Sequence, residues 1–192
     1  KWSAQYPGCS GHIHQSLSDG KTNLFHDASS SRKMSALFES YVAGQVACLL
    51  EFAPMFWPTI NSYKRLVDGF WAPVKPTWGI DNRTASFRVL AGSPKSTRLE
   101  TRCPGADVNP YLAMAAVIAA GLHGVEHNLK LTTPPVTGTN QGAENVPRAP
   151  RTLAETTRIF RESEIARDWL GDTFVHHFAA TRDWEWRQGL GG

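Results

Sequence analysis

The sequence predicts an α+β fold, with a curved, mostly antiparallel sheet and helices packed behind it. Strand-type segments occupy residues 10–27 and 84–103, where polar and apolar residues alternate around turn residues. Helical periodicity occupies residues 34–52, 109–129 and 152–187 instead. Because the chain has 192 residues, it is long enough to bury a sizeable core.

The first strand-type segment contains a turn at residues 18–21, after which TNLF is predicted to form a second short strand. An amphipathic helix is expected from Met34 to Phe52, ending before Pro54. The stretch from residue 58 to residue 110 lacks a helical period. Within it, TASFRVL and STRLETRC flank AGSPK, which predicts a hairpin with its turn near Gly92 to Lys95.

The second half of the chain is predicted to be mainly helical. Asn109 as N-cap and Pro110 at the first helical position begin a helix that is apolar nearly all round, so we expect it to be buried and to support the sheet. Residues 130–151 are rich in proline and predict a long loop. Residues 152–187 form a helical C-terminal region, in which a capping box at Thr152 opens one helix to about Leu170 and a second helix follows.

The composition is that of an ordinary globular protein, with 41% apolar and 19% charged residues and no internal repeat. The net charge of +3 is too small to indicate nucleic acid or a membrane surface as a partner, and no apolar run is long enough to span a bilayer. The three cysteines are scattered and odd in number, which favours reduced thiols over a disulfide framework. We therefore expect a cytoplasmic protein.

Two of the seven histidines lie one residue apart in GHIHQS. On a strand, His12, His14 and Ser16 share one face, and neighbouring side chains on that face are about 6.5–7 Å apart. A metal ion could then bind both imidazoles, or one imidazole could bind a metal while the other contacts a ligand. An exposed polar strand face is the third interpretation.

The predicted hairpin carries an unusual set of charges. Arg98, Glu100 and Arg102 share one face of its second strand, and Arg88 lies on the first. Such a face can be a solvated surface. The concentration of arginines between residues 65 and 102 favours a site for phosphate or carboxylate oxygens instead, with Glu100 and a histidine on a divalent metal.

Five motifs occur in the order and spacing of one enzyme family. They are SGHIHQSL, NSYKRLVDGFWAPV, DNRTASFRV, KSTRLETR and NPYLAMAAVIAAGLHGV. Through these motifs, about residues 7–128 of the sequence resemble the catalytic domain of glutamine synthetase. The resemblance implies that residues 1–192 are an incomplete catalytic domain, without the family's N-terminal β domain and its upstream metal ligands.

The resemblance also implies roles for individual residues. His12 and Glu100 match ligands of a catalytic Mg²⁺ or Mn²⁺ ion. Residues that match glutamate contacts are Gly8, Arg65 and Arg102. Residues that match ATP contacts are His14, Ser16, Arg83, Arg88 and Lys95. Of these, Arg83 matches the catalytic arginine at the point of phosphoryl transfer.

In such enzymes ATP phosphorylates the γ-carboxylate of glutamate, and ammonia or an organic amine then displaces the phosphate. The family implies a homo-oligomer, a double-ring dodecamer, for the full-length form. Since the N-terminal domain of one subunit completes the site of its neighbour, we expect residues 1–192 alone to be inactive.

Two positions depart from the family pattern. Trp71 replaces a glutamate that helps to bind and deprotonate ammonium, and an indole has one N–H donor and no basic site. Trp71 therefore predicts an amine site in which the indole stacks on or encloses a larger, more apolar amine, or holds a cation by its π face. Pro7 replaces an asparagine that contacts glutamate. Besides a ligase, both changes also fit a second interpretation, a non-catalytic relative with a structural role. A third interpretation is an unrelated phosphate-binding module whose motifs match by chance.

Overall fold

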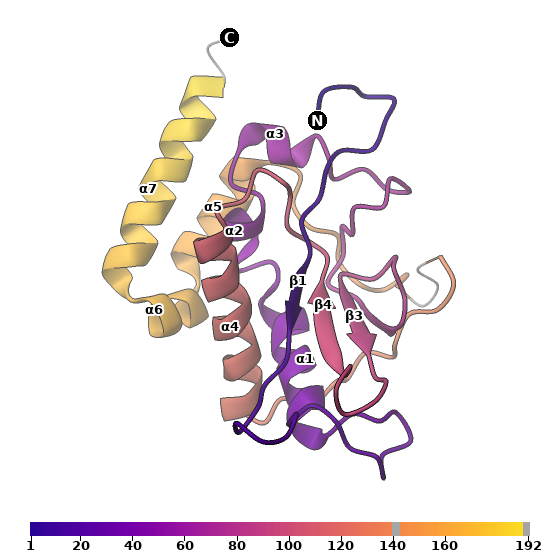
Figure 1. The fold of residues 1–192 in the computed structure, drawn as a ribbon. Helices are drawn as coiled ribbons and strands as arrows, with labels where there is room; N and C mark the ends of the chain where they lie inside the picture. Colours follow the sequence, from indigo (N-terminus) through magenta and orange to yellow (C-terminus); the bar gives the residue numbers. More distant parts are fainter. Residues whose placement is uncertain (140–142, 190–192) are drawn as a thin grey trace.

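The computed structural model describes residues 1–139 and 143–189, and within them it contains a four-stranded sheet and seven helices (Figure 1). The strands are β1 (Ile13–Gln15), β2 (Trp78–Ile80), β3 (Phe87–Leu90) and β4 (Arg98–Thr101). They lie in the order β1-β4-β3-β2, with β4 antiparallel to both β1 and β3 and with β2 parallel to β3. The predicted α+β class and the predicted hairpin are confirmed.

The register of the sheet aligns three polar side chains. His14 on β1 lies opposite Glu100 on β4, and Glu100 in turn lies opposite Arg88 on β3. Their neighbours along the strands, such as Val89 and Leu99, are fully buried. Because side chains alternate between the two faces of a strand, one face of the sheet is apolar and faces the core, and the other carries this polar row.

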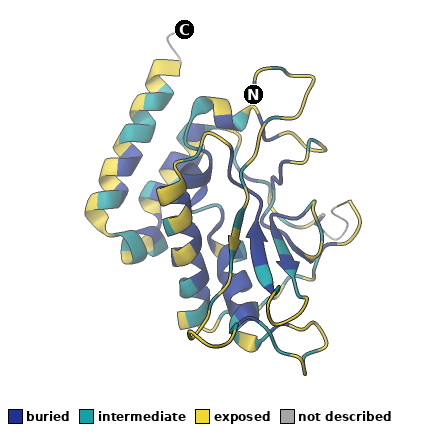
Figure 2. Cartoon of the chain, viewed as in Figure 1, coloured by how far each residue is buried: buried dark blue, intermediate teal, exposed yellow. Residues whose placement is uncertain are grey.

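Seven helices surround the sheet in the described residues. They are α1 (Ala36–Cys48), α2 (Ala53–Phe56), α3 (Ile60–Tyr63), α4 (Pro110–Glu126), α5 (Leu153–Glu162), α6 (Glu164–Leu170) and α7 (Asp172–Gly189). Helix α1 begins at Ser35, whose hydroxyl accepts a hydrogen bond from the Phe38 N–H, as an N-cap does. Figure 2 shows that α1, β3 and β4 are mostly buried, whereas the outer side of α7 is exposed.

Helices α1 and α4 support the sheet as a closely packed pair. A Cβ atom on Gly44 of α1 would lie 2.1 Å from the Ala120 carbonyl oxygen of α4, so only glycine permits this crossing. Tyr41 of α1 then donates a hydrogen bond to Gln15 of β1 (2.7 Å), and Gln15 donates to Thr101 of β4 (3.0 Å). The helix pair thereby holds the two strands that carry His14 and Glu100.

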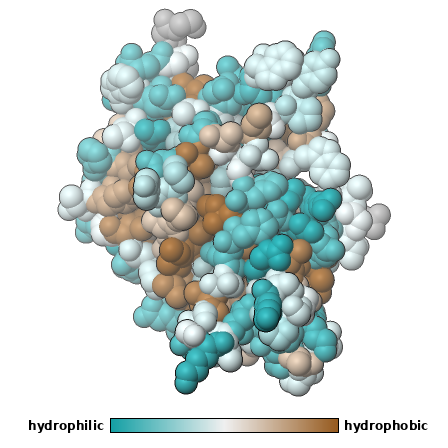
Figure 3. Space-filling view, in the orientation of Figure 1, coloured by the Kyte–Doolittle hydropathy of each residue, from teal (hydrophilic) through white to brown (hydrophobic). Residues whose placement is uncertain are grey.

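The expectation that the helix from Asn109 is buried all round is wrong for one face. Asn109 does cap α4, but Tyr111, Met114 and Ile118 are 79%, 43% and 52% exposed. These positions follow helical spacing, so they form one apolar stripe along α4. Figure 3 shows this apolar region beside the hydrophilic surface over the sheet.

Other predictions needed correction at the boundaries of elements. TNLF forms no strand, and a single bridge between Ser18 and Asn23 closes that turn. The predicted helix to Leu170 is two helices, because Ser163 ends α5 and caps α6. Strand β2 and helix α3 lie within residues 58–83, for which no element was predicted. Residues 140–142 of the predicted loop lie outside the described residues.

None of the helices within residues 1–139 and 143–189 combines the length and apolar character needed to cross a membrane.

Candidate active site

A buried carboxylate, Glu100, is the centre of the polar face of the sheet. Its side chain is 4% exposed and accepts hydrogen bonds from Arg102 (2.9 Å to Oε1) and Arg88 (3.1 Å to Oε2). Two imidazoles approach the same Oε1 atom, with His12 Nδ1 at 3.0 Å and His14 Nε2 at 3.6 Å. The structure therefore brings together five of the residues that the sequence singled out.

The charges around Glu100 keep it ionised. Burial acts to raise the pKa of Glu100, but the hydrogen bond from Arg88 and the charge and hydrogen bond of Arg102 lower it below its ordinary value. Burial lowers the pKa of His12, and the positive charge of Arg102 lowers it further. The face thus holds an ionised carboxylate beside an imidazole that favours its neutral form, the form that binds metals.

His14 is oriented differently from His12. Its Nδ1 atom accepts a hydrogen bond from Arg98 Nε (3.0 Å). Since arginine can only donate, the proton of a neutral His14 ring lies on Nε2. Nε2 is then a donor and not a metal ligand, which favours the interpretation in which the two histidines have separate partners.

The predicted glutamate contacts Gly8 and Arg65 lie in one pocket of about 170 Å³, which Cys9, Ser62 and Asp107 also line. A Cβ atom on Gly8 would lie 3.0 Å from Arg65 Cγ, so glycine lets the chain approach this arginine closely. The third predicted contact, Arg102, lies outside this pocket; it donates to Glu100 and, through Nε, to the Arg83 carbonyl (3.0 Å).

Arg65 is an unusual arginine because it is buried without a carboxylate partner in the described residues. It is 4% exposed, and its Nη2 atom donates a hydrogen bond to the Cys103 carbonyl (2.6 Å). Its Nε atom is the only buried side-chain nitrogen or oxygen within the described ranges that lacks a hydrogen-bond partner. Burial lowers the pKa of Arg65. A buried guanidinium with an unpartnered N–H has the chemistry to accept an anionic ligand.

An open groove of about 770 Å³ lies at the far edge of the sheet and contains Arg83 and Arg88. Arg83 is exposed, and Arg88 is anchored by Asp81, whose Oδ1 accepts from its Nη2 (2.5 Å) and Nε (3.0 Å). Trp71 lies on the wall of the groove and is 64% exposed. The groove therefore combines two arginines with an aromatic surface.

Two predicted nucleotide contacts lie away from that groove. Ser16 is exposed just beyond β1, on the same face as His14. Lys95 is exposed in the turn between β3 and β4, beyond the last pair of that hairpin, Leu90 and Arg98. Together with Arg88 they would span the polar face along its length.

The thiols differ in reactivity. Cys9 is exposed in the Arg65 pocket, whereas Cys48 and Cys103 are buried. Burial raises the pKa of Cys48 to about 12 and that of Cys103 to about 11. Since the thiolate is the reactive form, burial and the raised pKa both disfavour reaction at Cys48 and Cys103.

Two residues predicted to bind a metal, His12 and Glu100, lie side by side in the structure. No group of three or more histidine, cysteine, aspartate or glutamate side chains gathers as metal ligands do within residues 1–139 and 143–189. His12 and Glu100 offer one nitrogen and one carboxylate, which fits a hard divalent ion completed by water or phosphate oxygens.

Comparison with known proteins identifies the family. The family model described as "Glutamine synthetase, catalytic domain" matches residues 1–189. The chain belongs to the glutamine synthetase family. The resemblance seen in the five motifs is thus confirmed, and it extends through the helical C-terminal region.

The names of its relatives include a glutamine synthetase, a ligase for isopropylamine and a synthetase for an ethanolamide. The chain is 53% identical over 187 residues to type-1 glutamine synthetase 2 of Dictyostelium discoideum, covering 95% of this chain and 36% of that protein. It is 40% identical over 190 residues to glutamate–isopropylamine ligase of Pseudomonas sp, covering 98% and 41%. It is 40% identical over 195 residues to gamma-glutamylethanolamide synthetase of Streptomyces coelicolor, covering 94% and 41%.

A solved structure entitled "GmaS/ADP complex-Conformation 1" has a TM-score of 0.87 at 28% identity, and the match covers 100% of this chain and 45% of that one. The chain therefore spans less than half the length of the glutamine synthetase relatives it matches.

Two residues of the site were not predicted. Asp81 anchors Arg88, and Asp107 accepts hydrogen bonds from Thr59 and Ser62 beside the Arg65 pocket. Neither residue belongs to an alternating strand pattern. Asp81 reaches Arg88 because β2 pairs with β3, and these two parallel strands are not connected by a hairpin turn. No local signal in the sequence distinguishes them.

Proposed function

We propose that the full-length protein is an ATP-dependent ligase that joins the γ-carboxylate of glutamate to ammonia or an organic amine. The observation that carries this proposal is the polar row across three strands, in which Glu100 is surrounded by two histidines and two arginines. Membership in the glutamine synthetase family and the names of the relatives support the same reaction class.

Glutamate would bind through the Arg65 pocket. A substrate carboxylate there would accept a hydrogen bond from the unpartnered Nε atom of Arg65 and would offset a charge that is buried at a cost. Gly8 would place its backbone beside the bound carboxylate, because glycine lets the chain lie close to the Arg65 side chain. Arg102, 7% exposed, would face a second carboxylate of the substrate.

ATP would lie over the polar face, with its phosphates directed towards the groove of Arg83 and Arg88. The nucleotide would also contact His14 and Ser16 near β1, and Lys95 in the turn between β3 and β4. Guanidinium forks suit the charge that spreads over phosphoryl oxygens during transfer, and Arg83 is the exposed fork that can reach them.

His12 and Glu100 would hold a Mg²⁺ or Mn²⁺ ion. When bound, such an ion supplies positive charge beside the transferring phosphoryl group. Arg88 and Arg102 already supply part of that charge, since both contact Glu100.

The reaction has two steps. First, a γ-carboxylate oxygen of glutamate attacks the γ-phosphorus of ATP, forming an acyl phosphate and releasing ADP. Second, the nitrogen of a neutral amine attacks the acyl carbon, so that a C–N bond forms and the C–O bond to phosphate breaks. The electron pair leaves with phosphate, which also takes the amine proton. The products are a γ-glutamyl amide, ADP and phosphate.

A second candidate is a non-catalytic relative with a structural role. It is favoured by Trp71, which stands where the family has a catalytic glutamate. The two candidates make opposite predictions for the full-length protein mixed with ATP, Mg²⁺, glutamate and an amine. A ligase releases phosphate only when both glutamate and an amine are present. A folded protein that binds ATP but releases no phosphate with ammonia or any amine tested would favour the structural role.

A further inference from the structure

Of the three cysteines, only Cys9 is exposed, and it lines the Arg65 pocket. Gly8, the residue before it, lies against Arg65, since a Cβ atom on Gly8 would be 3.0 Å from Arg65 Cγ. The backbone of Cys9 is held in place because its carbonyl accepts a hydrogen bond from the Ala106 N–H (3.3 Å). An accessible thiol is therefore fixed at the wall of the pocket in which we place glutamate.

The buried guanidinium of Arg65 points to a negatively charged ligand beside this thiol. Its Nε atom has no hydrogen-bond partner among the described residues. Nε lies next to the segment that holds Cys9, because a Cβ atom on Gly105 would be 3.5 Å from Nε, and Gly105 directly precedes Ala106. A carboxylate that accepts the unused N–H would stabilise this buried charge.

The carboxylate that lines the pocket, Asp107, does not fill this role. Its Oδ2 atom accepts hydrogen bonds from the hydroxyls of Thr59 (2.9 Å) and Ser62 (2.6 Å). In the part of the chain that the structure describes, no ion pair joins it to Arg65. Lys1 adds a further positive charge to the lining. The charge of Arg65 thus remains available to a ligand.

The pocket also limits the size of what can be attached to Cys9. Its volume of about 170 Å³ is well below the roughly 300–1,000 Å³ of pockets for drug-sized ligands. It suits a short chain that ends in a carboxylate.

We propose that Cys9 is a redox modification site, at which disulfide exchange with a small disulfide that carries carboxylates closes the glutamate pocket. As regulation of catalysis, this inference rests on the ligase function proposed above. The Cys9 thiol loses its proton to solvent, and its sulfur attacks one sulfur of the small disulfide. A new S–S bond forms, the old one breaks, and the electron pair leaves with the departing thiolate, which takes up a proton. Cys9 is oxidised and the departing half is reduced.

The attached half then competes with glutamate. Its carboxylate accepts the Nε N–H of Arg65, so the modified enzyme no longer binds glutamate there. A thiol reductant reverses the change, because exchange runs in both directions. Glutamate that is already bound protects Cys9 for the same reason.

The first test measures the charge preference of the site in the full-length protein and requires no enzymatic activity. Mass spectrometry follows the adduct at Cys9 with dithiodipropionate, neutral hydroxyethyl disulfide and cationic cystamine, and each rate is divided by the rate of the same reagent with the urea-unfolded protein. Dithiodipropionate should react about tenfold faster than hydroxyethyl disulfide, the order of effect of a hydrogen bond between charged groups, and cystamine should react slowest.

Two variants locate the preference. Arg65→Gln removes the guanidinium and should abolish the preference for the anionic disulfide. The matched control is Arg158→Gln, since Arg158 is 62% exposed on α5, outside the pocket, and its loss should leave the preference unchanged. A second measurement does not depend on the folding of Arg65→Gln: saturating glutamate should slow the reaction of the wild-type protein with dithiodipropionate by about tenfold.

The activity test uses phosphate release with ATP, Mg²⁺, glutamate and an amine. Full modification of Cys9 should abolish release, and dithiothreitol should restore it. Cys9→Ser, given the same treatment, should keep the activity that it had before treatment.

The outcomes separate this inference from the proposed function. Equal normalised rates for the three disulfides, or a fully modified enzyme with an unchanged KM for glutamate, would overturn the inference while the ligase function stands. If the untreated, folded enzyme releases no phosphate with any amine, the ligase function fails and the regulatory role fails with it. The charge preference would still decide whether Cys9 and Arg65 form an anion-selective modification site.

Discussion

Replacement of the central carboxylate, Glu100→Gln, should destabilise the protein strongly. The side chain keeps its shape, but Arg102 loses its carboxylate partner and Arg88 keeps only the exposed Asp81. Removing one partner of a buried ion pair costs about 3–5 kcal/mol. Because Arg88 is 13% exposed and retains Asp81, we expect the lower end of that range, about 3 kcal/mol.

Thermal unfolding followed by circular dichroism measures this effect. For a chain of this length, about 3 kcal/mol lowers Tm by about 6–12 °C. The matched control is Asp81→Asn, which removes the other carboxylate that contacts Arg88. Because the Asp81 side chain is 70% exposed, this change should lower the free energy of unfolding by at most about 1 kcal/mol, and Tm by at most about 4 °C. Equal shifts for the two variants, or no shift for Glu100→Gln, would mean that Glu100 is not the buried counter-ion of this face.

Three further predictions follow from the site and the core. Arg83→Ala should mainly lower kcat of the full-length enzyme, whereas Arg65→Ala should mainly raise KM for glutamate; steady-state kinetics that show equal effects on both parameters would contradict the assigned roles. Gly44→Ala should destabilise the protein by about 2 kcal/mol or more despite the better helix propensity of alanine, because the helix crossing has no room for a Cβ atom; denaturant unfolding measures it, and a stabilised variant would contradict the packing. A thiol reagent at neutral pH should label Cys9 fast and the two buried cysteines slowly, and glutamate should slow the labelling of Cys9; mass spectrometry reads both, and labelling that glutamate does not change would argue against the Arg65 pocket as its site.

Local patterns predicted the parts of the site that lie on strands. Strict alternation placed His12, His14 and Ser16 on one face, and the structure finds all three exposed between half-buried neighbours. The same alternation placed Glu100 with Arg102, and the hairpin turn brought Arg88 opposite. These inferences succeed because a two-residue period is local and directly visible in the sequence.

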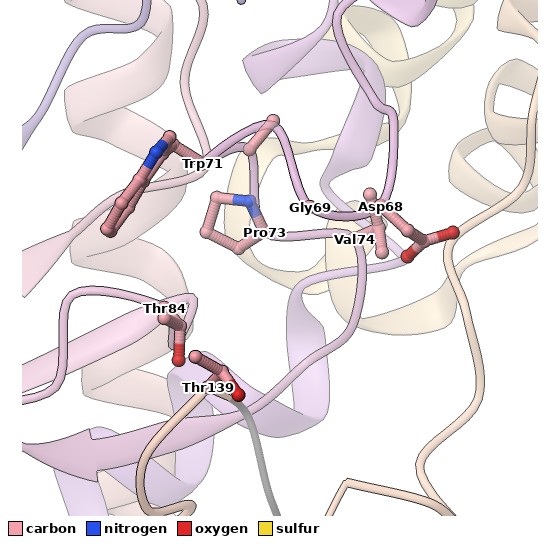
Figure 4. A pocket seen from close by; sticks show the side chains of 8 residues that line it. Asp68, Gly69, Trp71, Pro73, Val74, Thr84 and Thr139 are labelled. Atoms are coloured by element: carbon pink, nitrogen blue, oxygen red, sulfur yellow. The ribbon is translucent and has the colours of Figure 1, made fainter.

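Features that depend on distant pairing could not be predicted in this way. Strand β2 has three residues and is defined by its parallel partner β3. One pocket is lined by Trp71, Thr84 and Thr139, which come from three separate loops (Figure 4). The exposed stripe on α4 was missed because a helix that is apolar all round carries no signal for which face remains uncovered.

The proposed reaction depends on an acyl phosphate that forms on glutamate, and the fate of one oxygen atom shows whether this intermediate forms. Because the second step breaks the bond between carbon and oxygen, the released phosphate keeps an oxygen from the γ-carboxylate of glutamate. The full-length enzyme, given ATP, Mg²⁺, an amine and glutamate labelled with heavy oxygen in that carboxylate, should release labelled phosphate together with a γ-glutamyl amide, both detected by mass spectrometry. Unlabelled phosphate, or phosphate released at the same rate without the amine, would contradict the account.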